Sequence, residues 1–335
     1  MKQPTLSVLD QSVSVAGSTE DAAIRDTLDL AQHCERLGYA RFWVSEHHGL
    51  PTIIGSAPEI LMAAIAARTS RIRIGSAGVM LPHYSALKVA EQFRVLEALA
   101  PGRIDLGVGR APGGDMRTAR ALNPNAHAAA DQFPEQVRDL QAWTSQPAHE
   151  GIAAHPHGPH APEVWILGSS NYGAQLAAHF GLPYAYAYFF VDGQGADEAL
   201  ALYRRLYRPS ERHPEPRATV CVWALAAATH DEAAHHALGR ERWRVDRARG
   251  VLGPLQAPDA IARRGFTPDE WPTVEAMRAK AFVGTGAEVG AQLRALAQEL
   301  QLDEIVVNTW AHDPAVRRTS YALLAREFGL EGEVP

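Results

Sequence analysis

Short apolar runs alternate with amphipathic segments along almost the whole chain. Most of the runs are continuous Val, Ile, Leu and aromatic residues, a pattern typical of parallel strands that are covered on both faces. We expect eight strands, over residues 5–9, 41–45, 72–79, 103–108, 163–168, 184–190, 218–228 and 304–310.

The segments between the strands carry helix signals. The polar run at 18–21 can cap a helix that ends at Gly38, and Pro58 fits the first turn of a helix that runs to Arg68. Eight strands with interleaved helices predict an α/β fold, a (β/α)8 TIM barrel, with an open doubly wound sheet as the alternative. No linker or repeat divides the chain, so we expect one domain over 1–335. The other expected helices cover 86–99, 172–180, 195–207, 287–300 and 314–328.

Two connections are too long to be simple loops. Residues 111–162 follow the fourth expected strand, and residues 229–286 follow the seventh. Long loops at this end of a barrel usually build or cover the active site, so we expect long insertions there. The first insertion contains three histidines among prolines and a glycine, at 155–160. We interpret this stretch as a solvated loop, because neither a carboxylate nor a cysteine joins the histidines as a metal ligand.

Composition excludes several classes of partner. The 335 residues are 46% hydrophobic and 21% charged, with a formal net charge of −6 and no run of basic residues. Nucleic acid and anionic membrane surfaces are therefore not expected as partners. Cys34 and Cys221 lie far apart in apolar segments, which favours buried thiols in a reducing, cytoplasmic setting.

The strand at 41–45 runs directly into Glu46, His47 and His48. Titratable groups at the end of an apolar strand are costly unless they are paired or hydrogen-bonded. In parallel α/β proteins the carboxyl ends of the strands are also where ligands bind. We therefore expect a functional site here; the alternative is a purely structural hydrogen-bonded cluster at the barrel mouth.

Two further strands end in candidate anion sites. The strand at 103–108 opens into a glycine-rich loop with Gly109 and Arg110, whose glycine spacing differs from the dinucleotide fingerprint. Arg110 is placed to pair with a phosphate, although a structural ion pair would explain it as well. The strand at 163–168 ends in a turn followed by a helix, and such a helix N-terminus either binds an anion or is simply capped by serine. The residues of this turn include Gly168, Ser169, Ser170, Tyr172 and Gly173.

Small residues interrupt the third strand at Ser76, Ala77 and Gly78. They leave room for a ligand to pack, or they serve a tight layer of the barrel. In a barrel the ends of strands two to five are neighbours. A phosphate held near Arg110 would place an attached planar ring over 76–78, with its reactive edge near His47. This arrangement suits flavin mononucleotide (FMN).

The same segments resemble the bacterial luciferase-like flavin-dependent monooxygenases, most densely at 43–48, 75–82, 101–110, 167–170 and 312–324. The resemblance implies a barrel that binds reduced FMN as a co-substrate, activates O2 and oxidises a small organic substrate. The reduced flavin would come from a separate flavin reductase. The resemblance also implies a homodimer, formed through helices beside strands two and three. The alanines of helix 58–68 would permit close approach of a second helix, and close packing of this helix on its own sheet would explain them almost as well.

The resemblance also assigns roles to residues. His47 corresponds to a general acid/base, with Glu46 orienting it or pairing with it. Ala77–Gly78 corresponds to a non-proline cis peptide behind the flavin ring. Arg110 and Ser170 correspond to phosphate contacts, whereas Gly173 could offer only its N–H.

Three other functions stay open. The deazaflavin F420 could replace FMN and change the chemistry to hydride transfer, and a non-catalytic flavin-binding barrel would show similar motifs. A metal-dependent hydrolase is disfavoured, because adjacent residues such as His47 and His48 point to opposite faces of a strand. We therefore expect no metal. The substrate and light emission are not predicted, and the candidates for lining the substrate pocket are Tyr84, Tyr188, Trp223 and Trp310.

Overall fold

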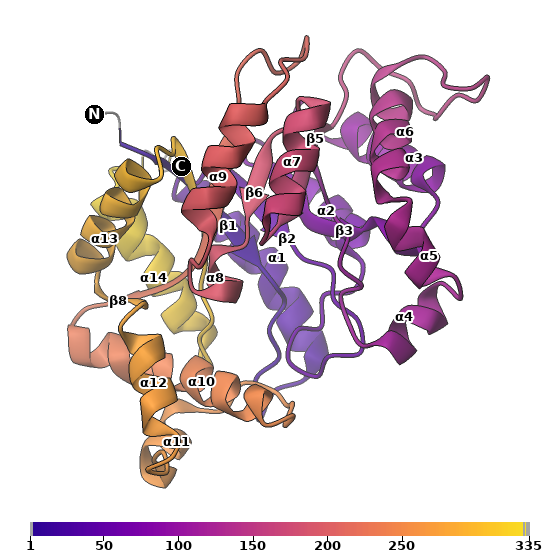
Figure 1. The fold of residues 1–335 in the computed structure, drawn as a ribbon. Helices are drawn as coiled ribbons and strands as arrows, with labels where there is room; N and C mark the ends of the chain where they lie inside the picture. Colours follow the sequence, from indigo (N-terminus) through magenta and orange to yellow (C-terminus); the bar gives the residue numbers. More distant parts are fainter. Residues whose placement is uncertain (1–2, 331, 333–335) are drawn as a thin grey trace.

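The computed structural model describes residues 3–330 and 332, and it shows a parallel strand barrel surrounded by helices (Figure 1). The strands, in chain order, are β1 (Thr5–Asp10), β2 (Arg41–Val44), β3 (Arg73–Met80), β4 (Ile104–Gly109), β5 (Glu163–Gly168), β6 (Tyr184–Tyr186), β7 (Ala218–Ala227), β8 (Phe282–Thr285) and β9 (Glu304–Asn308).

Eight of these strands close the barrel. Neighbouring strands pair in order from β1 to β7, then β7 pairs with β9, and β9 returns to β1. All of the pairings are parallel, as in a TIM barrel. The predicted (β/α)8 fold is confirmed, and the open doubly wound alternative is wrong. The extra strand, β8, pairs with the end of β7 outside the closed ring.

The barrel helices follow the strands closely. They are α1 (Glu20–Arg36), α2 (Pro58–Ala66), α3 (Ala86–Leu99), α6 (Phe133–Ser145), α7 (Asn171–Phe180), α9 (Ala196–Leu206), α13 (Gly286–Glu299) and α14 (Pro314–Glu327). Local signals fix several starts: the side chain of Thr19 accepts a hydrogen bond from the Ala22 amide, and Thr285 and Glu288 form a capping box. None of the described helices combines the length and apolar character needed to cross a membrane.

Both predicted insertions contain elements of their own. The connection after β4 carries α4 (Met116–Leu122) and α5 (Ala126–Asp131) ahead of α6. The connection after β7 carries α10 (His230–Ala248), α11 (Pro258–Arg264), α12 (Trp271–Arg278) and β8. Figure 1 shows α10, α11 and α12 grouped below the barrel strands as drawn. The connection after β3 begins with a short 3-10 helix, η1 (Leu81–His83), and α8 (Tyr188–Val191) follows β6.

One predicted strand is too long. The apolar aromatic run at 184–190 reads as a single strand, but β6 ends at Tyr186 and the run continues as α8. Ala187 breaks the extended conformation with φ −78° and ψ 70°. The turn carries Phe189 and Phe190 to the wall of the barrel mouth, so their apolar character serves a cavity and not the sheet.

The amino end of the barrel is closed by paired charges. Arg41 at the start of β2 forms ion pairs with Asp105, at 2.7 Å, and with Glu304, at 2.8 Å. The indole of Trp43 donates to Asp105 at 2.9 Å and packs edge-on against Trp165. A Cβ on Gly75 would lie 2.5 Å from that indole, so this glycine serves barrel packing. With the amino end filled, the carboxyl end of the barrel is left for ligands.

Candidate active site

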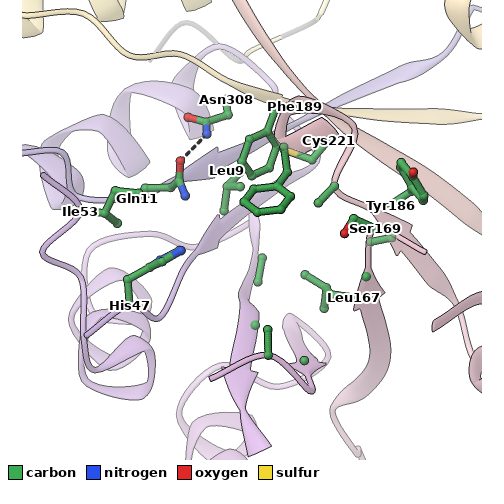
Figure 2. A pocket seen from close by; sticks show the side chains of 18 of the residues that line it. Leu9, Gln11, His47, Ile53, Leu167, Ser169, Tyr186, Phe189, Cys221 and Asn308 are labelled. Atoms are coloured by element: carbon green, nitrogen blue, oxygen red, sulfur yellow. Dashed lines mark hydrogen bonds between the residues drawn. The ribbon is translucent and has the colours of Figure 1, made fainter. Parts of the chain in front are cut away.

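A cavity of about 760 Å³ opens at the carboxyl end of the barrel. Figure 2 shows His47 and Ser169 on opposite sides of it, with Leu9 and Phe189 between them in this view. Ten of the twelve predicted site residues line this cavity, and Glu46 and Ser76 do not. The ten are His47, Ala77, Gly78, Gly109, Arg110, Gly168, Ser169, Ser170, Tyr172 and Gly173.

His47 follows the end of β2 and presents its imidazole to the cavity. Its backbone N–H donates to the Gly55 carbonyl at 2.9 Å, and its Nδ1 lies 3.2 Å from the Ser45 hydroxyl. Burial, helped by the neighbouring charges of His48 and Arg247, lowers the pKa of His47 from 6.5 to about 4. The imidazole is therefore neutral near pH 7, and it is able to accept a proton.

Glu46 is almost completely buried and faces away from the cavity. Its Oε1 accepts hydrogen bonds from the Tyr84 hydroxyl at 2.6 Å and lies 2.7 Å from Nε2 of His48. Its Oε2 accepts the Met80 amide at 3.0 Å. The expected pairing of Glu46 with His47 is therefore wrong. The carboxylate instead fastens the segment after β2 to the end of β3.

The two adjacent histidines diverge, as expected. His47 lines the cavity, whereas His48 turns to Glu46. Within the part of the chain that is described, no group of three or more His, Cys, Asp and Glu side chains is arranged to hold a metal ion.

The wall formed by β3 and β4 is thin. The peptide bond between Ala77 and Gly78 is cis, at the place that the family resemblance implied. A Cβ on Gly78 would lie 2.8 Å from the Gly107 carbonyl oxygen, so the backbones of β3 and β4 approach closely. Ser76 is fully buried and donates to that same carbonyl at 2.8 Å instead of reaching the cavity. A flat ligand can therefore approach the backbone at Ala77 and Gly78.

A cradle for an anion lies between the end of β4 and the start of α7. The Arg110 guanidinium stands 4.1 Å above the centre of the Tyr172 ring, which lies in the first turn of α7. Ser170 is the N-cap residue, and its side chain makes no capping hydrogen bond. The first amides of α7 and the hydroxyls of Ser169 and Ser170 are therefore available to a ligand. This donor set is suited to a phosphate group.

Gly173 is constrained by its neighbour on β6. A Cβ at this position would lie 3.2 Å from the ring of Tyr184, whose hydroxyl in turn donates to the Ser170 carbonyl at 3.1 Å. A hydroxyl-bearing side chain at 173 would crowd that ring. Gly173 therefore offers its backbone amide to the cradle, and no side chain.

The pocket-lining aromatics were only partly predicted. Trp223 and Trp310 line the cavity, whereas Tyr84 bonds to Glu46 and Tyr188 packs elsewhere. Gln11, which the sequence did not single out, accepts a hydrogen bond from Asn308 at 2.6 Å (Figure 2). It also accepts one from the Trp310 indole at 3.0 Å. The Oδ1 atom of Asn308 is buried and has no partner among the described residues.

The largest feature missed from the sequence is on α10. Arg240, Trp243, Arg244 and Arg247 all line the cavity. Their spacing places the three arginines and the tryptophan on one face of a helix, and this pattern is visible in the sequence. That signal alone did not reveal that this face covers the barrel mouth.

Comparison with known proteins gives one consistent result. A family model described as luciferase-like monooxygenase matches residues 5–304. The uncharacterised protein YwcH of Bacillus subtilis is 42% identical over 97% of this chain and 99% of its own. The N-acetyl-S-alkylcysteine monooxygenase of the same organism is 35% identical over 96% of this chain and 97% of its own. The crystal structure of apo-MsnO8 superimposes with a TM-score of 0.91 at 36% identity, covering 99% of both chains.

Proposed function

The chain belongs to the luciferase-like monooxygenase family, and from that premise we propose that it uses reduced FMN and O2 to oxidise a small organic substrate. The observation that carries the proposal is that His47, the Ala77–Gly78 wall and the cradle at Arg110 share one cavity. This one cavity can therefore hold a phosphate and a flat ring, with a proton acceptor of the protein beside them.

In this proposal the cradle holds the flavin phosphate. Arg110 supplies a charge-assisted contact, and Ser169, Ser170 and the first amides of α7 supply hydrogen bonds. Gly168 at the end of β5 and Tyr172 and Gly173 in the first turn of α7 line the cavity at this turn. Gly109 at the end of β4 has no side chain that would take up space in the cavity. Ala77 and Gly78 let the ring approach the backbone, while Ser76 ties β3 to β4 behind it.

His47 is the proposed catalytic base. Bound reduced flavin would supply the electrons that activate O2. The Nδ1 atom of His47 is engaged with Ser45, so Nε2 is the ring nitrogen left to take or return a proton at the substrate. Glu46 acts as a positioning residue, because it holds the ends of β2 and β3 in register through His48 and Met80.

Three further parts of the proposal concern partners and setting. The loop at 109–114 does not fit a nicotinamide dinucleotide, which favours reduced flavin delivered by a separate reductase. We propose a homodimer through α2 and α3, where Ile60, Val95 and Leu99 are exposed. We also place the protein in the cytoplasm, where its free, buried cysteines would stay reduced.

The experiment is a cofactor titration followed by an oxidation assay. Purified protein is titrated with FMN and with F420 by fluorescence, and then supplied with a flavin reductase, NADH and O2. An N-acetyl-S-alkylcysteine, the compound class for which one relative is named, heads the substrate panel. We expect Arg110→Ala to weaken FMN binding by about ten- to a hundredfold, as for loss of a charged hydrogen bond, while Arg205→Ala on the exposed face of α9 changes nothing.

The variant His47→Gln separates the remaining alternatives. We expect it to bind FMN as the native protein does and to lose substrate oxidation. Binding of F420 in place of FMN would support the hydride-transfer alternative. FMN binding that is unaffected by Arg110→Ala, or product formation that is unaffected by His47→Gln, would contradict the proposal.

A further inference from the structure

One face of α10 presents cations to the cavity. Arg240, Arg244 and Arg247 line it together with Trp243, at the spacing of successive helical turns. Trp243 fixes the position of this face, because its indole donates to the Thr52 hydroxyl at 2.8 Å and packs on Trp310 at 4.8 Å. The helix face that carries the guanidinium groups is therefore held at the mouth by the packing of Trp243 against the barrel.

One of the three arginines is neutralised. Arg244 makes two parallel hydrogen bonds to Asp192, both 2.6 Å long. This fork-to-fork geometry satisfies both carboxylate oxygens, so Asp192 has little capacity left for a second guanidinium. The cavity lining itself contains neither Asp nor Glu among the described residues.

Arg240 lacks a comparable partner. Its Cζ lies 4.3 Å from the Trp223 ring centre, and its Nη2 donates to the Phe189 carbonyl at a long 3.4 Å. Across the described chain it forms no ion pair with a carboxylate. Burial, and then the charge of Arg244, lower the pKa of Arg240 to about 9. A half-buried guanidinium without a carboxylate partner gains from a nearby anion.

Arg247 is the second cation without a described carboxylate partner. Its Cζ lies 5.3 Å from the Trp243 ring and 5.6 Å from the Phe190 ring. Its charge is one of those that lower the pKa of His47, which places it within electrostatic reach of the imidazole. Arg240, Arg247 and His47 line the same cavity, so an anion bound at these arginines would share that cavity with the imidazole.

These cations are separate from the flavin cradle. Around the closed ring, β7 is four strands from β3 in either direction, so Trp223 and Arg240 face the Ala77–Gly78 wall across the mouth. Arg110 stands instead against α7, beside β5. The indole of Trp223 lies against Arg240 and that of Trp243 against Arg247, and both offer an apolar surface next to the charge.

We propose that Arg240 and Arg247 bind the anionic group of the substrate, a carboxylate or sulfonate attached to an apolar body that packs on Trp223, Trp243 and Trp310. The substrate class is thus a small organic acid. This inference rests on the proposed function, since it assigns the opposite wall and Arg110 to FMN.

The test compares two probes that differ by one charged group. Anilinonaphthalene sulfonate carries a sulfonate, and phenylnaphthylamine is the same skeleton without it. Dissociation constants are measured by calorimetry with and without saturating FMN, so the comparison can be made in both states. The proteins are the native chain, the double variant Arg240→Gln/Arg247→Gln, and Arg205→Gln as an exposed arginine outside the cavity.

We expect the native protein to bind the sulfonate about tenfold or more tightly than the neutral probe, the strength of a charge-assisted contact. The double variant should lose this preference while keeping its affinity for the neutral probe and for FMN, and Arg205→Gln should retain it. A sulfonate that binds the native protein no more tightly than the neutral probe, or binds the double variant equally well, overturns the inference. Failure of the proposed function shows differently, as FMN that does not bind or does not respond to Arg110→Ala.

Discussion

His47 should make the stability of the folded protein depend on pH in a measurable way. In the unfolded chain its pKa is the ordinary 6.5, whereas burial lowers it to about 4 in the folded protein. As the pH falls, the unfolded state therefore takes up the proton first, and the folded state loses stability between about pH 6.5 and pH 4. The full pKa difference of His47 between the two states corresponds to about 3 kcal/mol in the free energy of unfolding. Between about pH 7 and pH 4.5 it amounts to about 2 kcal/mol.

The measurement is urea unfolding of the native protein and of His47→Gln at those two pH values. The native protein should lose about 2 kcal/mol more than the variant on going to the lower pH. His33, His213 and His236 also have lowered pKa values, but they are present in both proteins and cancel. His157→Gln, in the exposed loop, serves as the control. An equal loss in native protein and His47→Gln would refute the reasoning.

Two other substitutions test packing and assembly. A Cβ in Gly107→Ala would clash with the Ser76 carbonyl oxygen, so urea unfolding should show that the free energy of unfolding falls by about 1–3 kcal/mol. The control Gly158→Ala, whose Cβ would have nothing within 4 Å, should be neutral. Equal stability of the two variants would contradict the close approach of β3 and β4. Ile60 is 66% exposed on α2, and Ile60→Asp should shift the protein from dimer to monomer in light scattering. The control Leu206→Asp, on α9, should leave the dimer intact. A dimer that is unchanged by Ile60→Asp would place the interface elsewhere.

The barrel could be predicted because its strands are apolar on both faces. Continuous runs mark seven of the closing strands well, and closure then fixes which strand ends are neighbours. This is why His47, Arg110 and the turn at 168–173 reach one cavity although each comes from a different strand. The errors in the predicted strands lie where a short apolar run is not part of the closed barrel. The four residues of β8 carry too little pattern to stand out in a long insertion, and the run after Tyr186 turns into α8.

Contacts between loops were beyond the sequence. The partner of Glu46 depends on where Tyr84 lies after η1, 38 residues further along the chain. Ser76 was expected to face the ligand, but the close approach of β3 to β4 turns its hydroxyl to Gly107. The arginines of α10 are plain in the sequence, yet their role depends on how that helix docks on the mouth, which Trp243 and Thr52 determine. Periodicity carries no information about such docking.

The unbalanced charge of the cavity wall has a consequence for any experiment on this protein. Four guanidinium groups line the wall, and among the described residues only that of Arg244 has a carboxylate partner, although the chain as a whole carries a formal charge of −6. The mouth therefore attracts small anions of every kind, and sulfate or phosphate in a buffer will compete with whatever is meant to bind. At about 0.1 M salt the attraction extends over roughly 10 Å. The affinity of this barrel for its ligands is thus a property of the protein together with the ionic strength, and the two must be stated together.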